Sequence, residues 1–132
     1  MLNARALTAA IAATMVAGNQ PALSHHSFAV FDIDHPIELS GTVQAFKFTS
    51  PHAFILLEVK DGHGVATVWT LEGASPSTLL RDGWSSQTLK SGDQITLSVD
   101  PLRSGSPGGA WNSQKVNYRD GHPVVCCSPD GF

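Results

Sequence analysis

Two adjacent histidines, His25 and His26, have the residue type and position in this chain that best suit metal chemistry. They follow a segment with the composition of a secretory leader, and cleavage after Ser24 would give His25 a free amine beside its imidazole. Amine and imidazole nitrogens are ligands that Cu(II) favours. The sequence therefore predicts a copper-competent terminus of the histidine-brace type, in which a third nitrogen completes a T-shaped site. An ordinary polar chain end is the alternative interpretation.

His52 is the internal histidine best placed to supply that third nitrogen. Pro51 fixes the backbone just before the most apolar strand, which puts the imidazole at a strand start near the barrel mouth. A turn histidine with a structural hydrogen bond is the alternative. His63 lies in a glycine-containing loop, and His35 and His122 each precede a proline, so these three are weaker candidates.

The two cysteines, Cys126 and Cys127, are adjacent and close to the C-terminus, and form a possible thiol site. Consecutive Cα atoms lie about 3.8 Å apart, closer than the roughly 4.4 to 6.8 Å of ordinary disulfides. Four interpretations stay open: a strained vicinal disulfide, bridges to another chain, a dithiol that holds a soft metal, or an incidental tail.

Two tryptophans, Trp84 and Trp111, follow glycine-bearing turns and are candidates to line a ligand cleft. A cap over the end of a barrel is the alternative role for both rings. Trp69 alternates with the polar Thr70 and is predicted to belong to the core. Glu58 and Glu72 fall on neighbouring strands and could make a carboxylate pair. We expect both to be outward-facing solvated acids, because strand alternation places Glu58 on the face opposite to the apolar residues of its strand.

Residues 1–24 predict a secretory signal peptide. One cation precedes the apolar run at residues 7–18, and the small residues Ala22 and Ser24 stand at the −3 and −1 positions of a cleavage site. The run is too short for the roughly 20 residues of a membrane helix. We therefore expect an exported mature chain, residues 25–132, that is a single periplasmic or secreted domain without membrane insertion.

The charge balance is acidic, with 8 basic and 11 acidic side chains and a net charge of −3. Nucleic acid phosphates demand clustered Lys and Arg, so this balance predicts that nucleic acid is not a partner. A small ligand or another protein is the expected partner.

The elements that must position these residues are mainly strands. Runs rich in β-branched and aromatic residues predict strands at residues 37–48, 53–60, 65–72, 94–100, 114–118 and 122–127. Gly41 interrupts the first run, where we expect a bulge or bend. The segment at residues 103–110 is a flexible loop by composition. This pattern favours a mainly all-β fold: a small five- or six-stranded antiparallel OB-like barrel, with an open β-sandwich as the alternative.

One short helix is predicted between the third and fourth strands. Ser75 is suited to cap its first amides, Pro76 suits the first helical position, and Gly83 ends it. Leu79 and Leu80 are expected to face inward.

The ordered motifs of the chain resemble a family of small exported bacterial proteins known as a domain of unknown function. The motifs are the His-His-Ser-Phe start at residues 25–28, Gly-Thr-Val at 41–43, Pro-His at 51–52, Gly-Trp at 83–84 and Gly-Asp at 92–93. The resemblance covers nearly the whole mature chain and implies a secreted or periplasmic barrel-like domain with no assigned activity. The chain departs from the family pattern at Phe48 and Ser50, where Trp and Asn are common, and in its Cys126-Cys127 ending.

Taken together, these features predict a non-enzymatic domain that binds a ligand or partner, with His25, His26 and His52 as the preferred site. The alternatives are a copper protein whose histidine terminus carries metal or performs oxidation, and an accessory domain of an exported oxidoreductase. No cofactor other than copper is indicated.

Overall fold

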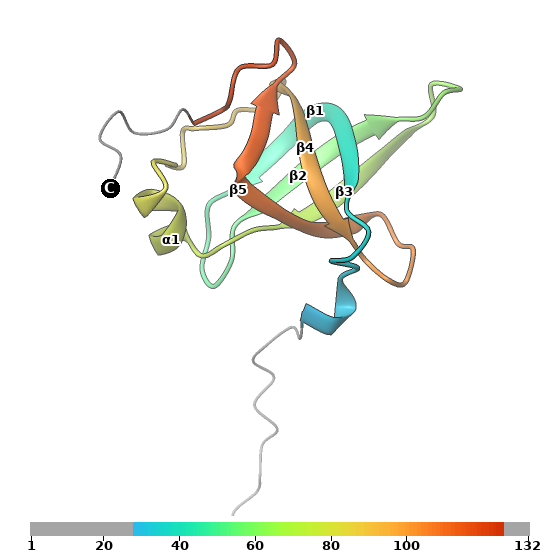
Figure 1. Ribbon diagram of the computed structural model, residues 1–132. Helices are drawn as coiled ribbons and strands as arrows, with labels where there is room; N and C mark the ends of the chain where they lie inside the picture. Colours follow the sequence, from blue (N-terminus) through green and yellow to red (C-terminus); the bar gives the residue numbers. More distant parts are fainter. Residues whose placement is uncertain (1–27, 126–132) are drawn as a thin grey trace, which may run out of the picture.

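The computed structural model describes residues 28–125 as a five-stranded barrel with one short helix (Figure 1). The expected leader, His25, His26, Cys126 and Cys127 lie outside the described residues. In chain order the elements are the 3-10 turn η1 (Phe28–Val30), β1 (Ile37–Lys47), β2 (Phe54–Lys60), β3 (Ala66–Glu72), α1 (Pro76–Arg81), β4 (Gln94–Pro101) and β5 (Gly108–Tyr118).

The strands close into a ring in the order β1-β2-β3-β5-β4. All neighbours are antiparallel except β3 and β5, which pair in parallel. The predicted small OB-like barrel is confirmed, and the sandwich alternative is wrong because β1 joins both β2 and β4 and leaves no second sheet.

The core follows from strand alternation. In β4 the inward residues Ile95, Leu97 and Val99 are at most 2% exposed, while the polar residues between them face outward. Ile55 and Leu57 do the same in β2. Burying these side chains is the main favourable contribution to folding, at about 1.5–3 kcal/mol for each large apolar side chain.

Gly41 lies where the long strand β1 changes partners. Residues 37–42 pair with β4 and residues 42–47 pair with β2, so β1 must bend at the point where its partner strand changes. A Cβ on Gly41 would lie under 3.0 Å from the Glu58 carbonyl oxygen. The predicted bend is therefore confirmed, and a bulge follows it between Val43 and Ala45.

The helix begins and ends as its sequence predicts. The Ser75 hydroxyl accepts a hydrogen bond from the Thr78 amide at 3.3 Å, and Gly83 takes a positive φ of 86° just after the helix. The expectation for Leu80 is wrong: Leu79 is fully buried but Leu80 is 58% exposed, because adjacent helical residues point about 100° apart. Within residues 28–125 no helix is long and apolar enough to cross a bilayer.

The last part of the chain differs from its sequence prediction at both ends of β5. The strand starts at Gly108, not at residue 114, because Gly108 and Gly109 pair with β3 where side chains would collide. A Cβ on Gly109 would lie 2.6 Å from the Asp100 carbonyl oxygen. The strand predicted at residues 122–127 is also wrong as far as residue 125, where the described chain ends. In that part of the chain an isolated bridge joins Asn117 and Pro123.

Candidate functional site

His52 lies just before β2 and contacts a carboxylate from the end of β3. Its Nδ1 atom pairs with Oε1 of Glu72, and the two side chains are 41% and 18% exposed. The backbone beside them is fixed, since Ala53 donates to the Ala74 carbonyl at 3.0 Å and accepts from Gly73 at 2.8 Å. A carboxylate that accepts from Nδ1–H leaves Nε2 as the basic ring atom, free to bind a ligand. His52 lies in the β1–β2 loop just before β2, near the strand start where the sequence placed it, and Glu72 is its partner.

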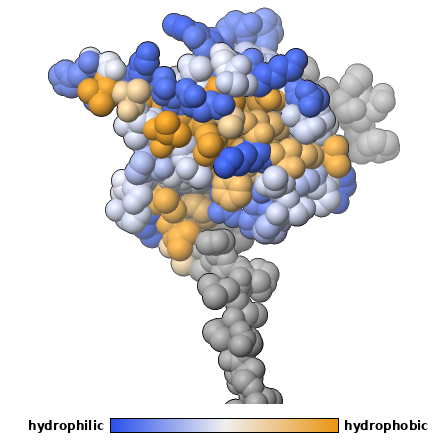
Figure 2. Space-filling model, turned by 180° about the vertical axis from the view of Figure 1, so that it is seen from behind, coloured by the Kyte–Doolittle hydropathy of each residue, from blue (hydrophilic) through white to orange (hydrophobic). Residues whose placement is uncertain are grey.

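Apolar side chains lie beside this pair on the outward face of β2 and β3. Phe54 is the cross-strand neighbour of Glu72, and Leu56 is that of Thr70; both apolar residues are half-buried. Val68, farther along β3, is 47% exposed. Figure 2 shows apolar surface among hydrophilic side chains on this reverse side of the molecule, including the projecting β2–β3 hairpin. The pair therefore borders a mixed surface of the kind that binding sites use.

The first described residues attach to the barrel next to the end of β3. The Val30 carbonyl accepts from the Arg103 amide at 2.9 Å, and Phe31 forms a bridge with Leu102. The same β4–β5 loop reaches β3, where Thr70 donates to the Pro107 carbonyl at 3.2 Å. In Figure 1 η1 and the β4–β5 loop lie together at the lower right of the barrel, and the β1–β2 loop lies at its lower left.

Trp84 and Trp111 fill the inside of the barrel end. They are 1% and 6% exposed, and their ring centroids lie 5.1 Å apart. Phe46 contacts both rings, and Gly73 lies so close to the Trp111 indole that a Cβ there would overlap it. Both indole N–H groups are buried without a partner among the described residues. Both rings therefore lie where a cap over the barrel end would place them, and neither ring faces an open cleft.

Trp69 packs against the core as predicted, but it is only half-buried.

The remaining described histidines are exposed and separate from His52. His35 contacts Asp32 at 3.2 Å, and His122 contacts Asp120 at 3.1 Å. Hydrogen bonds from the backbone and side chain of His122 hold the pKa of Asp120 below its usual value. Within residues 28–125 no group of three or more His, Cys, Asp or Glu side chains is placed to hold a metal ion.

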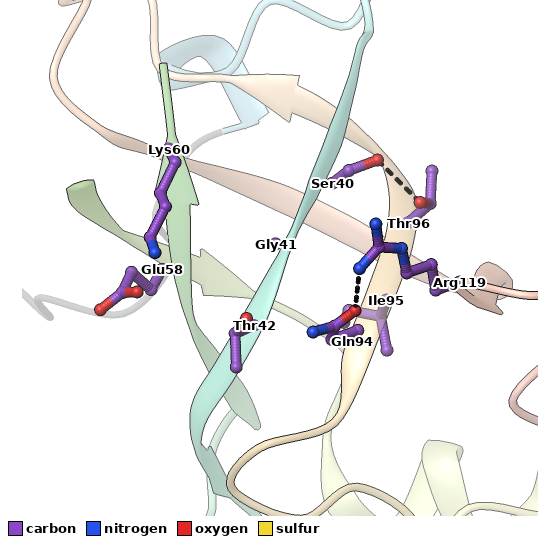
Figure 3. Close-up of a pocket in the computed structure, with 9 residues that line it drawn as sticks. All are labelled: Ser40, Gly41, Thr42, Glu58, Lys60, Gln94, Ile95, Thr96 and Arg119. Atoms are coloured by element: carbon purple, nitrogen blue, oxygen red, sulfur yellow. Dashed lines mark hydrogen bonds between the residues drawn. The ribbon is translucent and has the colours of Figure 1, made fainter. Parts of the chain in front are cut away.

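A polar groove lies on the outside of the barrel over the bend in β1. It encloses about 620 Å³ and contains hydroxyl, amide and charged groups (Figure 3). Its lining residues are Ser40, Gly41, Thr42, Glu58, Lys60, Gln94, Ile95, Thr96 and Arg119. The groove lies toward the end of β2, whereas His52 precedes its start, so the two sites are distinct.

The sequence profile of the Family of unknown function (DUF6152) matches residues 12–113. The chain belongs to this family. The resemblance drawn from the His-His-Ser-Phe, Gly-Thr-Val, Pro-His and Gly-Trp motifs is thereby confirmed at the level of a domain of unknown function. The match includes His25, His26 and His52 and ends before Cys126 and Cys127. No curated protein matches the DUF6152 chain.

A solved structure similar to this DUF6152 chain is a mitochondrial single-stranded DNA-binding protein of S. cerevisiae, Rim1. The identity is 10% and the TM-score 0.45, and the likeness covers 64% of this chain and 94% of that one. This finding contradicts the expected exclusion of nucleic acid, which rested on charge balance. Net charge alone does not exclude that class of partner.

Sequence reasoning located His52 but missed Glu72 as its partner and missed the polar groove of this DUF6152 chain. The outward residues of β1, β2 and β4 were recognisable from alternation. The divergence of β2 from β4 at Thr42, which opens the groove, depends on how the barrel closes. No local pattern in the sequence carries that information.

Proposed function

We propose that the chain is an exported, periplasmic or secreted, non-enzymatic domain that binds a ligand or partner through His25, His26 and His52. The observation that carries the proposal is the contact of Glu72 with Nδ1 of His52, which leaves Nε2 as the ring nitrogen that can bind a ligand. Glu72 orients the imidazole in advance, which lowers the entropic cost of binding.

The position of the chain start supports the same site. Residues 28–31 attach to the β4–β5 loop, which in turn touches β3 near Glu72. His25 is three residues ahead of Phe28, a reach of about 10 Å for extended chain. The family match also includes the three histidines and leaves the cysteine pair outside.

Export predicts a chain that lacks residues 1–24. Ala22 and Ser24 satisfy the small-residue rule for cleavage, so we expect His25 at the terminus of the exported protein. Intact mass spectrometry of protein recovered from the periplasm or medium measures this directly. A mass that retains residues 1–24 would contradict both the proposed compartment and the terminal part of the site.

Copper binding is the second candidate function, and the His52–Glu72 pair favours it. Metal-ligating histidines almost always donate their other ring N–H to a carboxylate or a similar acceptor, and this pair has that arrangement. The amine and imidazole of His25, together with His52, would supply three nitrogen ligands for Cu(II). A carrier and an oxidative copper protein both fit such a site.

Copper titration of the processed protein tests the site. We expect one Cu(II) per chain, with binding that weakens as pH falls because amine and imidazole must lose their protons to ligate. One extra residue ahead of His25 separates the amine from its imidazole and should weaken binding sharply. Glu72→Gln should weaken it by roughly 10- to 100-fold through the loss of ring orientation. The matched control, His63→Ala, removes an exposed loop histidine and should change nothing.

Equal affinity of the extended and processed proteins would show that the terminal amine is not a ligand. Equal affinity of His52→Gln and the unchanged protein would remove His52 from the site and, with it, the observation on which the proposed function rests.

A further inference from the structure

The polar groove owes its shape to the point where β1 changes partners. Thr42 pairs with Gln94 of β4 on one side and with Glu58 of β2 on the other. From there β2 and β4 diverge, so residues 40–42 form the floor between them. The volume of about 620 Å³ falls within the range of roughly 300 to 1,000 Å³ typical of small-molecule sites.

The groove presents hydroxyl groups that are accessible to a ligand. Ser40 and Thr96 hydroxyls hydrogen-bond to each other at 2.7 Å across the β1–β4 pair, in an exposed position. Thr42 lies on the same floor. Hydroxyl groups both donate and accept, so this row can exchange its internal bond for bonds to the hydroxyls of a sugar-like ligand.

Arg119 is fixed over one wall of the groove. Its Nη1 donates to the Gln94 side-chain oxygen at 2.5 Å, and its backbone amide donates to the Gln94 carbonyl at 3.0 Å (Figure 3). The backbone contact holds residue 119 beside β4, and the single side-chain contact leaves most of the five N–H donors of the guanidinium unused. A planar fork of donors is suited to an oxyanion.

A second cation, Lys60, lies across β1 from Arg119. Within residues 28–125 neither cation lies within ion-pair distance of a carboxylate, although the chain carries more acids than bases. The one acid of the groove, Glu58, accepts from the Gln44 side chain at 3.0 Å. The lining therefore carries two positive charges, Lys60 and Arg119, against one negative charge, Glu58, and this balance favours a ligand with a negative charge.

We propose that this groove binds a small hydroxylated oxyanion, of the sugar acid or sugar phosphate class. Arg119 and Lys60 bind the carboxylate or phosphate, and the hydroxyls of Ser40, Thr42 and Thr96 bind the hydroxyls of the ligand. The site is independent of the His52 site and does not rest on the function proposed for it.

The test is a titration of the full mature chain with glucuronate and with glucose 6-phosphate, followed by NMR shifts of backbone amides. Glucose and inorganic phosphate each represent one half of glucose 6-phosphate. We expect each of them to bind at least ten-fold more weakly than glucose 6-phosphate. The shifts should cluster at residues 40–42, 94–96 and 119. Binding should weaken with added salt because the attraction is partly between exposed charges.

Matched variants distinguish binding in the groove from nonspecific attraction to positive charge elsewhere on the surface. Arg119→Gln should weaken binding by roughly ten-fold or more, since it removes charged hydrogen bonds to the oxyanion. Arg81→Gln removes an exposed arginine on α1 and should leave binding unchanged. Lys60→Gln and Lys115→Gln form a second pair of variants, in which the first removes a lysine of the groove and the second an exposed lysine outside it. Melting temperatures close to the unchanged protein would show that these surface variants are folded.

Three outcomes would overturn the proposal. One is an Arg119→Gln variant that binds both ligands as the unchanged protein does. Another is binding of glucose as tight as that of glucuronate, which would remove the role of the anion. The third is tighter binding of a single-stranded oligonucleotide at the same amides with a steep salt dependence, which would assign the groove to a nucleic-acid surface.

Discussion

Trp84→Ala is expected to lower the free energy of unfolding by about 3–5 kcal/mol. The ring is 1% exposed and lies between Trp111 and Phe46, with centroid distances of 5.1 and 5.9 Å. The expected loss comes from the packing of the buried ring and from the cavity left behind. Small domains are typically stable by only about 5–15 kcal/mol, so this one change removes a large share.

Urea denaturation followed by circular dichroism measures the effect without relying on tryptophan fluorescence. The matched control is Trp69→Ala, which truncates a half-buried ring at the edge of the core and should cost roughly half as much. If Trp84→Ala does not fold, Trp84→Phe keeps a ring against Trp111 and should lose less stability than the alanine variant is expected to lose. A Trp84→Phe protein and a Trp84→Ala protein that both unfold at the unchanged urea concentration would refute the buried cap.

The sequence predicted the barrel where local and long-range preferences agree. Alternation in β4 identified Ile95, Leu97 and Val99 as inward residues, and all three are buried. The helix start at Ser75 and its end before Gly83 were recognisable because capping hydrogen bonds and positive φ angles have residue preferences of their own.

Predictions failed where a distant strand decides local structure. Residues 108 and 109 are glycines and look like a loop, yet they start β5 because β3 and β4 approach too closely for side chains. The run at residues 122–125 has strand-like composition, but the described residues offer it only the bridge at Asn117. Leu80 is apolar and exposed because the short helix buries one face alone.

In the candidate site, too, local sequence predicted one part and the pairing of distant residues decided the other. Pro51 and the apolar strand after it were enough to place His52 at a strand start. Its partner Glu72 belongs to the next strand, and the pairing follows from the β2–β3 register, in which Phe54 is opposite Glu72. The groove combines residues of three strands and the turn after β5, so no spacing along the chain would have revealed it.

Gly41→Ala is expected to lower the free energy of unfolding by about 3 kcal/mol, the upper end of the usual cost of overpacking. The added Cβ would lie under 3.0 Å from the Glu58 carbonyl oxygen, and it would also meet the Leu57 side chain at 3.0 Å. A flexible side chain could turn away from such a contact, but the carbonyl belongs to the backbone of β2. Relief therefore requires β1 and β2 to separate at the bend where β1 changes partners.

The control for this change is Gly62→Ala, in the loop between β2 and β3. A Cβ there meets nothing within 4 Å, so its stability should stay within about 0.5 kcal/mol of the unchanged protein. Thermal and urea unfolding of the two variants gives the comparison. Because residues 40–42 form the floor of the polar groove, Gly41→Ala should also weaken oxyanion binding under conditions in which it remains folded, whereas Gly62→Ala should not. Equal stability of the two variants would mean that β1 bends at some other residue, since a bend at Gly41 leaves no room for the methyl group.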